Sequence, residues 1–227
     1  MNESLADRID AALPQTQCRR CGYPDCAAYA LAVAAGDASV NRCPPGGSVT
    51  INRLAELMDV APAALDPECG EQRPRLVAFV DEAWCIGCTL CIAACPVDAI
   101  VGAAKRMHAI IETLCTGCEL CIAPCPVECI HLEAARSGPI EPVLWLREQA
   151  QQAKQRYSAR NQRLGGASAL ARHAAKSMAK AGSDSLPGPS RDNSQQSAHA
   201  AVRRKRLIRE AVARSKARRM DRQHEQG

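Results

Sequence analysis

The sequence predicts an α+β fold divided into small units, and three observations lead to this prediction. Fourteen of the 227 residues are cysteines, and a pattern of closely spaced cysteines occurs twice, beginning at Cys85 and at Cys115. A short apolar run typical of a strand precedes each copy, at residues 76–80 and 109–112. The alanine-rich segment 27–35, in contrast, has the composition of a helix.

The repeated pattern reads C-x2-C-x2-C-x3-C-P in both copies. Three thiolates separated by two residues each let a short loop wrap one face of an iron–sulfur cubane. The fourth cysteine, which precedes a proline, reaches across to the other cluster. This spacing predicts one 4Fe-4S cluster on the first ladder and one on the second, with ligands Cys85, Cys88, Cys91 and Cys125 and ligands Cys115, Cys118, Cys121 and Cys95.

Zinc is the main alternative for these cysteines, because C-x2-C pairs also build tetrahedral zinc sites. A zinc ion needs only four ligands and has no use for a third closely spaced cysteine in each copy, so the clusters are favoured. A disulfide framework is disfavoured, since we expect no signal peptide ahead of the cysteines. Gly87 and Gly117 fit either a close approach to an inorganic ligand or an ordinary turn.

A different cysteine pattern lies upstream, and its spacing is C-x2-C-x4-C-x16-C. Four thiolates at this spacing can close a third 4Fe-4S cluster without an outside ligand, and Gly22 and Pro24 shape the tight loop between them. Zinc remains a rival here, because four cysteines satisfy it as well. The predicted ligands are Cys18, Cys21, Cys26 and Cys43.

Residues from about 75 to 132 resemble a bacterial two-cluster ferredoxin domain. The resemblance implies a compact α+β unit of two pseudo-symmetric halves, in which a short helix and a following strand come from residues 97–100 and 127–130 after each ladder. Four short strands and two short helices make a very small core. The clusters must therefore supply much of the folding free energy, and we expect the apoprotein to be poorly folded.

The C-x2-C-G-x-P-x-C block, followed by the alanine-rich helix, a glycine and C-P, is similar to the small iron–sulfur domain found in the B subunit of Rnf-type electron transport complexes. The order of the two domains over residues 18–132 matches that family too. The resemblance implies three 4Fe-4S clusters in one electron-transfer protein, with donor and acceptor redox proteins and other Rnf-type subunits as partners.

The family's B subunit ordinarily opens with a hydrophobic membrane anchor, whereas this sequence has no apolar run near the roughly twenty residues needed to cross a bilayer. We therefore expect a soluble relative without the anchor. Its many unprotected thiolates need a reducing compartment. The predicted location is the cytoplasm, or the cytoplasmic face of the inner membrane if a partner holds the chain there.

The remaining chemically active residues have ordinary roles in this prediction. Cys69 is expected to be a free thiol and Cys129 a small hydrophobe in the core, while His108 and His131 are expected to be surface or core histidines and not ligands. No nucleotide-binding glycine loop, nucleophile and base pair or substrate pocket is recognisable, so no catalytic residue is predicted. The chain is expected to be an electron carrier or a subunit of an oxidoreductase complex.

Charge divides the chain into an acidic part and a basic part. Residues 1–146 carry ten Lys or Arg and eighteen Asp or Glu, whereas residues 147–227 carry nineteen and six. The acidic part suits docking to basic redox partners, or simply solubility. The basic end suggests an alternative function, a redox-responsive iron–sulfur protein whose tail binds nucleic acid, an anionic membrane surface or another acidic partner.

These patterns together predict six segments. The first three are an N-terminal 4Fe-4S domain (1–66), a linker (67–74) and a two-cluster ferredoxin domain (75–140). The rest are a helical extension (141–181), a disordered linker (182–200) and a basic helical tail (201–227).

Overall fold

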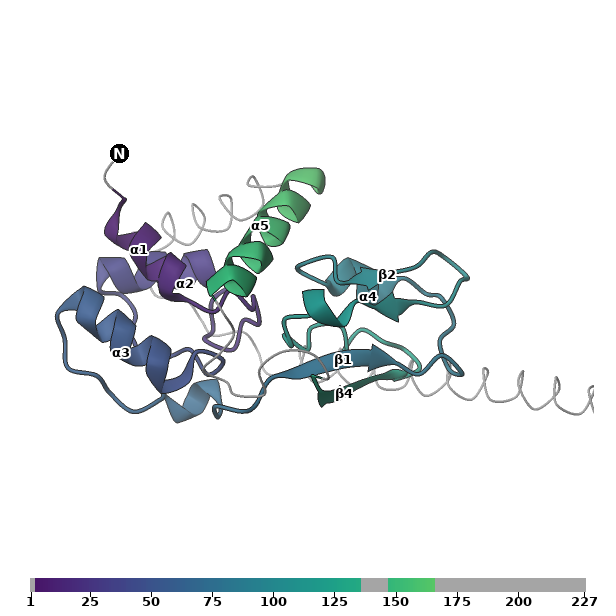
Figure 1. The fold of residues 1–227 in the computed structure, drawn as a ribbon, viewed down its shortest axis with the longest axis horizontal. Helices are drawn as coiled ribbons and strands as arrows, with labels where there is room; N and C mark the ends of the chain where they lie inside the picture. The colour runs from purple at the N-terminus through teal and green to yellow at the C-terminus, as the bar shows by residue number, and fades with distance from the viewer. Residues whose placement is uncertain (1–2, 136–146, 166–227) are drawn as a thin grey trace, which may run out of the picture.

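The computed structural model describes residues 3–135 and 147–165. They form a helical N-terminal unit, a small unit that contains all the described strands, and one helix that contacts both (Figure 1). The described part is therefore mixed α and β, in the order that the sequence predicts.

Three helices make up the N-terminal unit: α1 (Leu5–Ala12), α2 (Cys26–Ala35) and α3 (Gly47–Met58). The side chain of Asp25 caps α2 by accepting a hydrogen bond from the amide of Ala28, and Gly36 ends this helix in the left-handed conformation. The helix expected at residues 27–35 is thus confirmed, with one additional residue at its start.

The core of this unit is aliphatic and aromatic. Ile9, Leu13, Tyr29 and Leu54 are each at most 2% exposed and belong to one cluster of buried side chains. The hydroxyl of Tyr29 donates a hydrogen bond of 2.8 Å to the carbonyl of Ser39, which satisfies its polar end. A short 3-10 helix, η1 (Pro67–Cys69), follows within the predicted linker 67–74.

The second unit contains two antiparallel two-stranded sheets. β1 (Leu76–Val80) pairs with β4 (Ile130–Ala134), and β2 (Ile100–Val101) pairs with β3 (Ala109–Ile110). The strand expected at 76–80 is confirmed. The strand expected at 109–112 is shorter, because Glu112 already begins the 3-10 helix η2 (Glu112–Leu114).

The short helix lies about two turns earlier than expected. It is α4 (Leu90–Ala94), inside the first ladder, whereas residues 96–97 form a turn and residues 98–99 have no regular structure. The helix expected within 97–100 is wrong, because Asp98 has a φ of 51° and a helix cannot continue through that conformation. The strand expected after it is confirmed, since β2 begins at Ile100 and β4 at Ile130. The same segment of the second ladder forms only turns, since Pro124 stands where Ala94 ends α4 and has no N–H to donate.

The two ladders share an unusual backbone path. Positive φ values recur thirty positions apart, at Gly87 (67°) and Gly117 (69°), at Thr89 and Glu119 (both 64°), and at Asp98 and Glu128 (both 51°). A β carbon at Gly87 would lie 2.5 Å from the carbonyl oxygen of Arg106, and one at Gly117 would lie 2.4 Å from that of Leu76. The glycines therefore allow a close approach to protein backbone, in addition to their left-handed turns.

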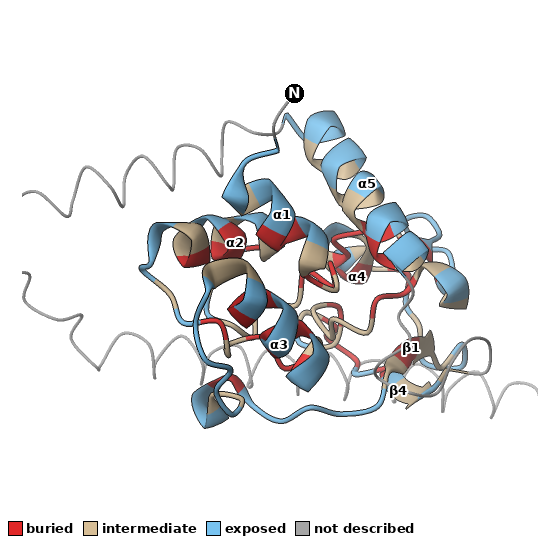
Figure 2. Cartoon of the chain, turned by 60° about the vertical axis from the view of Figure 1, so that its left-hand side comes forward, coloured by how far each residue is buried: buried red, intermediate tan, exposed pale blue. Residues whose placement is uncertain are grey.

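Helix α5 (Arg147–Arg163) contacts both units (Figures 1 and 2). Toward the N-terminal unit, the hydroxyl of Tyr157 hydrogen-bonds the Asp25 carboxylate at 3.0 Å, and Lys154 pairs with Asp10 at 2.5 Å. Toward the other unit, Arg156 donates to the carbonyls of Val97 and Asp98, at 2.8 and 2.9 Å. α5 lies within the predicted helical extension, and it fastens the two units together.

The predicted disordered linker (182–200) and basic tail (201–227) lie outside the described residues, so both stay predictions. Of the helices in residues 3–135 and 147–165, none combines the length and the apolar character that a bilayer-spanning segment needs.

The contact between α5 and the strand-containing unit can be tested with Arg156→Ala. We expect a loss of about 2 kcal/mol in the free energy of unfolding, because two hydrogen bonds from a charged group disappear. Arg147→Ala, an exposed arginine of the same helix, should change stability by less than about 0.5 kcal/mol. Urea unfolding of anaerobically purified protein measures both, and equal losses would contradict the contact.

The ladder turns can be tested with Gly117→Ala against Gly36→Ala. Both glycines have a positive φ, but a β carbon at Gly36 would meet nothing within 4 Å, whereas one at Gly117 would collide with backbone. Gly117→Ala should therefore cost about 2 kcal/mol more than Gly36→Ala, since an overpacking cost adds to the same conformational cost. Thermal unfolding of both variants decides this, and similar losses would disprove the steric argument.

Candidate iron–sulfur sites

Three cavities in the described residues each contain in their walls one of the sets of four cysteines predicted from the spacing, and the first-ladder cavity is lined by a fifth cysteine, Cys129. The N-terminal cavity encloses about 290 Å³ of space, the first-ladder cavity about 280 Å³ and the second-ladder cavity about 320 Å³, the parts open to solvent included. In that order, the predicted sets are Cys18, Cys21, Cys26 and Cys43; Cys85, Cys88, Cys91 and Cys125; and Cys95, Cys115, Cys118 and Cys121.

Each ladder supplies three cysteines to one cavity and its last cysteine to the other. Cys125 lines the first-ladder cavity, and Cys95 lines the second-ladder cavity. Backbone amides already point at some of these sulfurs: the amide of Ala99 lies 3.2 Å from Cys95 Sγ, and that of Ala78 lies 3.5 Å from Cys115 Sγ. Such N–H groups stabilise a thiolate that ligates iron.

A chain of buried polar side chains holds the loop that carries Cys18. Gln15 donates to the carbonyl and the carboxylate of Asp10, at 2.6 and 2.8 Å, and Gln17 donates to Gln15 at 2.8 Å. The Gln17 side chain in turn accepts from the amide of Cys26 at 3.0 Å. Gln15 and Gln17 both adopt a φ of 56°, so these contacts offset a conformation that L residues disfavour. Nothing in the cysteine spacing pointed to either glutamine.

The cysteines are reduced, and several are deeply shielded from water. All fourteen are free thiols in the structure. Burial raises the pKa of Cys91 and of Cys118 to about 11 and that of Cys121 to about 12, and it also raises the pKa of Cys26 and Cys43. Without a metal these thiols keep their protons at neutral pH, so binding of iron must release protons.

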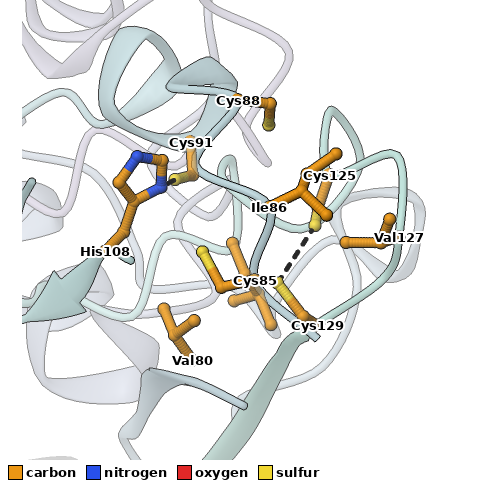
Figure 3. A pocket seen from close by; sticks show the side chains of 10 residues that line it. Val80, Cys85, Ile86, Cys88, Cys91, His108, Cys125, Val127 and Cys129 are labelled. Carbon is orange, nitrogen blue, oxygen red and sulfur yellow. Dashed lines mark hydrogen bonds between the residues drawn. The ribbon is translucent and has the colours of Figure 1, made fainter. Parts of the chain in front are cut away.

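Two further residues line the first-ladder cavity that the spacing did not identify as functional (Figure 3). Cys129 is buried as expected, but its Sγ lies 3.6 Å from that of Cys125. His108 is also buried, and its Nδ1 lies 3.2 Å from Cys91 Sγ. Both were expected to be ordinary packing residues, and neither has a sequence motif that would have revealed its contact. Cys69 is a buried free thiol, and His131 lies on β4 at the surface.

The N-terminal and second-ladder cavities are neighbours. Thr16 lines the first of these cavities and Thr116 lines the second. The hydroxyl of Thr116 donates a buried hydrogen bond of 3.0 Å to the carbonyl of Thr16. Arg20 also forms an ion pair with Glu119, which lines the second-ladder cavity. One direct hydrogen bond therefore joins the linings of these sites, and an ion pair beside it links Arg20 of the N-terminal cysteine loop to the second lining.

Two family models match this part of the chain. A model described as a 4Fe-4S dicluster domain matches residues 78–132, and a model described as "Putative Fe-S cluster" matches residues 13–45. Together they contain all twelve cysteines that the spacing predicts as ligands. No solved structure matches the chain.

Several curated relatives are named as the B subunit of an ion-translocating oxidoreductase complex. The one from Thiobacillus denitrificans is 62% identical over 107 residues, which cover 47% of this chain and 57% of the relative. Those from an Azoarcus species and from Stutzerimonas stutzeri are 58% and 60% identical, over 48% of this chain and 60% and 56% of their own lengths.

The chain thus spans less than two thirds of the length of these relatives. The resemblance inferred from the cysteine motifs is confirmed over the matched residues. In that part, the chain is a homologue of the B subunit of the Rnf-type ion-translocating oxidoreductases and contains a 4Fe-4S dicluster domain.

Proposed function

We propose that this chain is an electron-transfer protein that carries three 4Fe-4S clusters. One observation supports the number more than any other: three cavities each have one complete set of four cysteines in their walls. A 4Fe-4S cubane takes four thiolates, so three clusters use twelve of the fourteen cysteines. Cys69 and Cys129 remain.

The donor set fits the proposed clusters better than it fits zinc. Sulfur is the usual ligand of iron–sulfur clusters, and the twelve cysteines belong to the matched iron–sulfur regions. A zinc ion with Zn–S bonds of about 2.3 Å would need four sulfurs to converge on a single point. Each cysteine set here lines the wall of a cavity instead.

The clusters would supply one-electron chemistry when bound. The protein's part is to hold the thiolates fixed, to donate hydrogen bonds to the sulfurs and to limit the access of water. At the second-ladder site, the amides of Ala78 and Ala99 donate hydrogen bonds to the sulfurs. Cys121 and Cys125 are only 6% and 4% exposed, and this deep burial helps to limit the access of water.

The contacts between the cavities suggest the order of electron transfer. The N-terminal site adjoins the second-ladder site through the Thr116–Thr16 hydrogen bond, and the two ladder sites share their loops through Cys95 and Cys125. The first-ladder cavity is walled by Ile86, which is 38% exposed, whereas its counterpart Thr116 is 4% exposed. Electrons would run between the N-terminal site and a partner docked near Ile86.

The partners in this proposal follow from the relatives. Because the homologues are named as subunits of an ion-translocating oxidoreductase complex, other subunits of such a complex are the proposed neighbours, and they would hold this chain at a membrane. The excess of acidic residues in 1–146 would speed encounter with a basic redox partner. Binding of nucleic acid by the basic tail stays a hypothesis from the sequence, because the tail lies outside the described residues.

Iron and acid-labile sulfide counts test the number of clusters. Anaerobically purified protein should contain about twelve irons and as many sulfides per chain, and dithionite should produce electron paramagnetic resonance signals of interacting reduced cubanes. Cys43→Ser should lower the count to about eight, whereas Cys69→Ser should leave it unchanged. About eight irons with one zinc in the unaltered protein would contradict the third cluster.

Removal of the clusters should affect the two units differently. Six of the fourteen buried residues in the core of the strand-containing unit are cysteines, but only one of the ten in the N-terminal core is. Chelation of iron should therefore abolish amide protection at β1 and β4, while part of the protection in α1 and α3 survives. Hydrogen exchange measured by mass spectrometry reports the protection of each unit separately. Full protection of β4 in the apoprotein would refute the prediction that this unit depends on its clusters.

A further inference from the structure

The walls of the two ladder cavities correspond position by position at an interval of thirty residues. The four predicted ligand cysteines of one cavity match those of the other, and so do Val97 and Val127, and Ile100 and Ile130. The two sites are therefore duplicated structures, and a residue that differs between them is a candidate for making them chemically different.

At two wall positions, the second-ladder cavity has alanine and the first-ladder cavity has a side chain that can donate a hydrogen bond. Ala78 of the second-ladder cavity corresponds to His108 of the first-ladder cavity, and Ala99 corresponds to Cys129. A methyl group has no hydrogen to donate to sulfur. An imidazole and a thiol each have one.

His108 is placed to donate to a sulfur. The ring is 2% exposed, and its Nδ1 lies 3.2 Å from Cys91 Sγ (Figure 3). Its Nε2 is buried and finds no hydrogen-bond partner among the described residues. A thiolate that ligates iron can only accept, so the proton of a neutral ring must sit on Nδ1.

The backbone beside His108 makes room for the ring. A β carbon at Gly102 would lie 2.4 Å from Cδ2 of His108, and Gly102 has a φ of 149°. A side chain at residue 102 would displace the imidazole from Cys91. Gly102 and His108 both lie in the connection between β2 and β3, and the imidazole packs closely against the glycine. The position of the imidazole is therefore fixed by this contact.

Cys129 makes the second contact. Its Sγ lies 3.6 Å from Cys125 Sγ, and the residue is 5% exposed. Since Cys125 completes the ligand set of this cavity, the remaining thiol is left to donate its S–H toward a ligand sulfur. At the equivalent place in the other cavity, the backbone amide of Ala99 points at Cys95 and the side chain adds nothing.

We propose that His108 and Cys129 are positioning residues that raise the reduction potential of the first-ladder cluster above the value it would have with alanine at both positions. This inference rests on the proposed function. Reduction adds one electron, and so one negative charge, to a cluster and its thiolates. Hydrogen bonds donated to those sulfurs stabilise the reduced form and raise the potential. The two side chains therefore favour transfer of an electron from the second ladder to the first, toward the surface near Ile86.

The test replaces each residue by the one that stands in the other half. His108→Ala, Cys129→Ala and the double variant are purified anaerobically with the full chain, and their iron content is measured first. A redox titration followed by electron paramagnetic resonance then gives the midpoint potentials. Cys88→Ser and Cys118→Ser, each of which removes one predicted ligand from one site, assign the signals to the two clusters.

We expect each single variant to lower the potential of the first-ladder cluster, the double variant to lower it furthest, and the second-ladder potential to stay in place. His108→Gln keeps an N–H donor, so its first-ladder potential should lie between that of His108→Ala and that of the unaltered protein. His131→Ala is the matched control, since this histidine lies on the exposed side of β4 and lines neither cavity. It should leave both potentials unchanged.

The outcomes separate this inference from the proposed function. Variants that keep the iron content of the unaltered protein but also keep its potentials would overturn the inference and leave the function standing. Too little iron in the unaltered protein would overturn the function itself. If His108→Ala loses iron, the potentials of Cys129→Ala and His108→Gln are used for the test instead, because both substitutions leave the cavity filled almost as well as in the unaltered protein. An unchanged first-ladder potential in Cys129→Ala would then refute the role of the thiol.

Discussion

The exchange of the last cysteine between the two ladders is the constraint on which the strand-containing unit depends. Cys95 belongs by sequence to the first ladder but lines the cavity of the second, and Cys125 does the reverse. Clusters bound in these cavities would tie the two halves together at their centre, where the flanking sheets are only two strands wide. A unit with so few apolar side chains would otherwise lack the buried surface to hold its halves together.

The N-terminal unit is stabilised in a different way from the strand-containing unit. Its core of Ile9, Tyr29 and Leu54 would bury apolar surface without any metal, and its cysteine loop is held from outside by the Asp10–Gln15–Gln17 chain. Helix α5 connects the two arrangements, because Tyr157 contacts the residue that caps α2 and Arg156 contacts the turn after Cys95. One helix thus reaches the surroundings of two cavities, and it fixes how they face each other.

The two ladders share the same backbone path but differ in the side chains that surround their cavities. Matching positive φ values at Gly87 and Gly117, and at Asp98 and Glu128, give both ladders the same path. Against this common path the side chains diverge: Thr116 is buried and contacts the N-terminal unit, whereas Ile86 is partly exposed. A carrier needs this kind of difference, because two identical sites would give an electron no preferred direction.

The sequence by itself determined the two ladders, the helix at residues 27–35 and the strand at residues 76–80, because these depend on local composition and periodicity. The cysteine spacing also predicts three sets of four ligands, and each set lines one cavity. Tertiary structure alone decided the rest. The helix predicted within 97–100 does not form, because Asp98 is left-handed, and α4 lies about two turns earlier. The contacts of His108 with Cys91 and of Arg156 with Val97 join residues 17 and 59 positions apart. Such pairs depend on how whole elements pack, and no local pattern in the sequence encodes them.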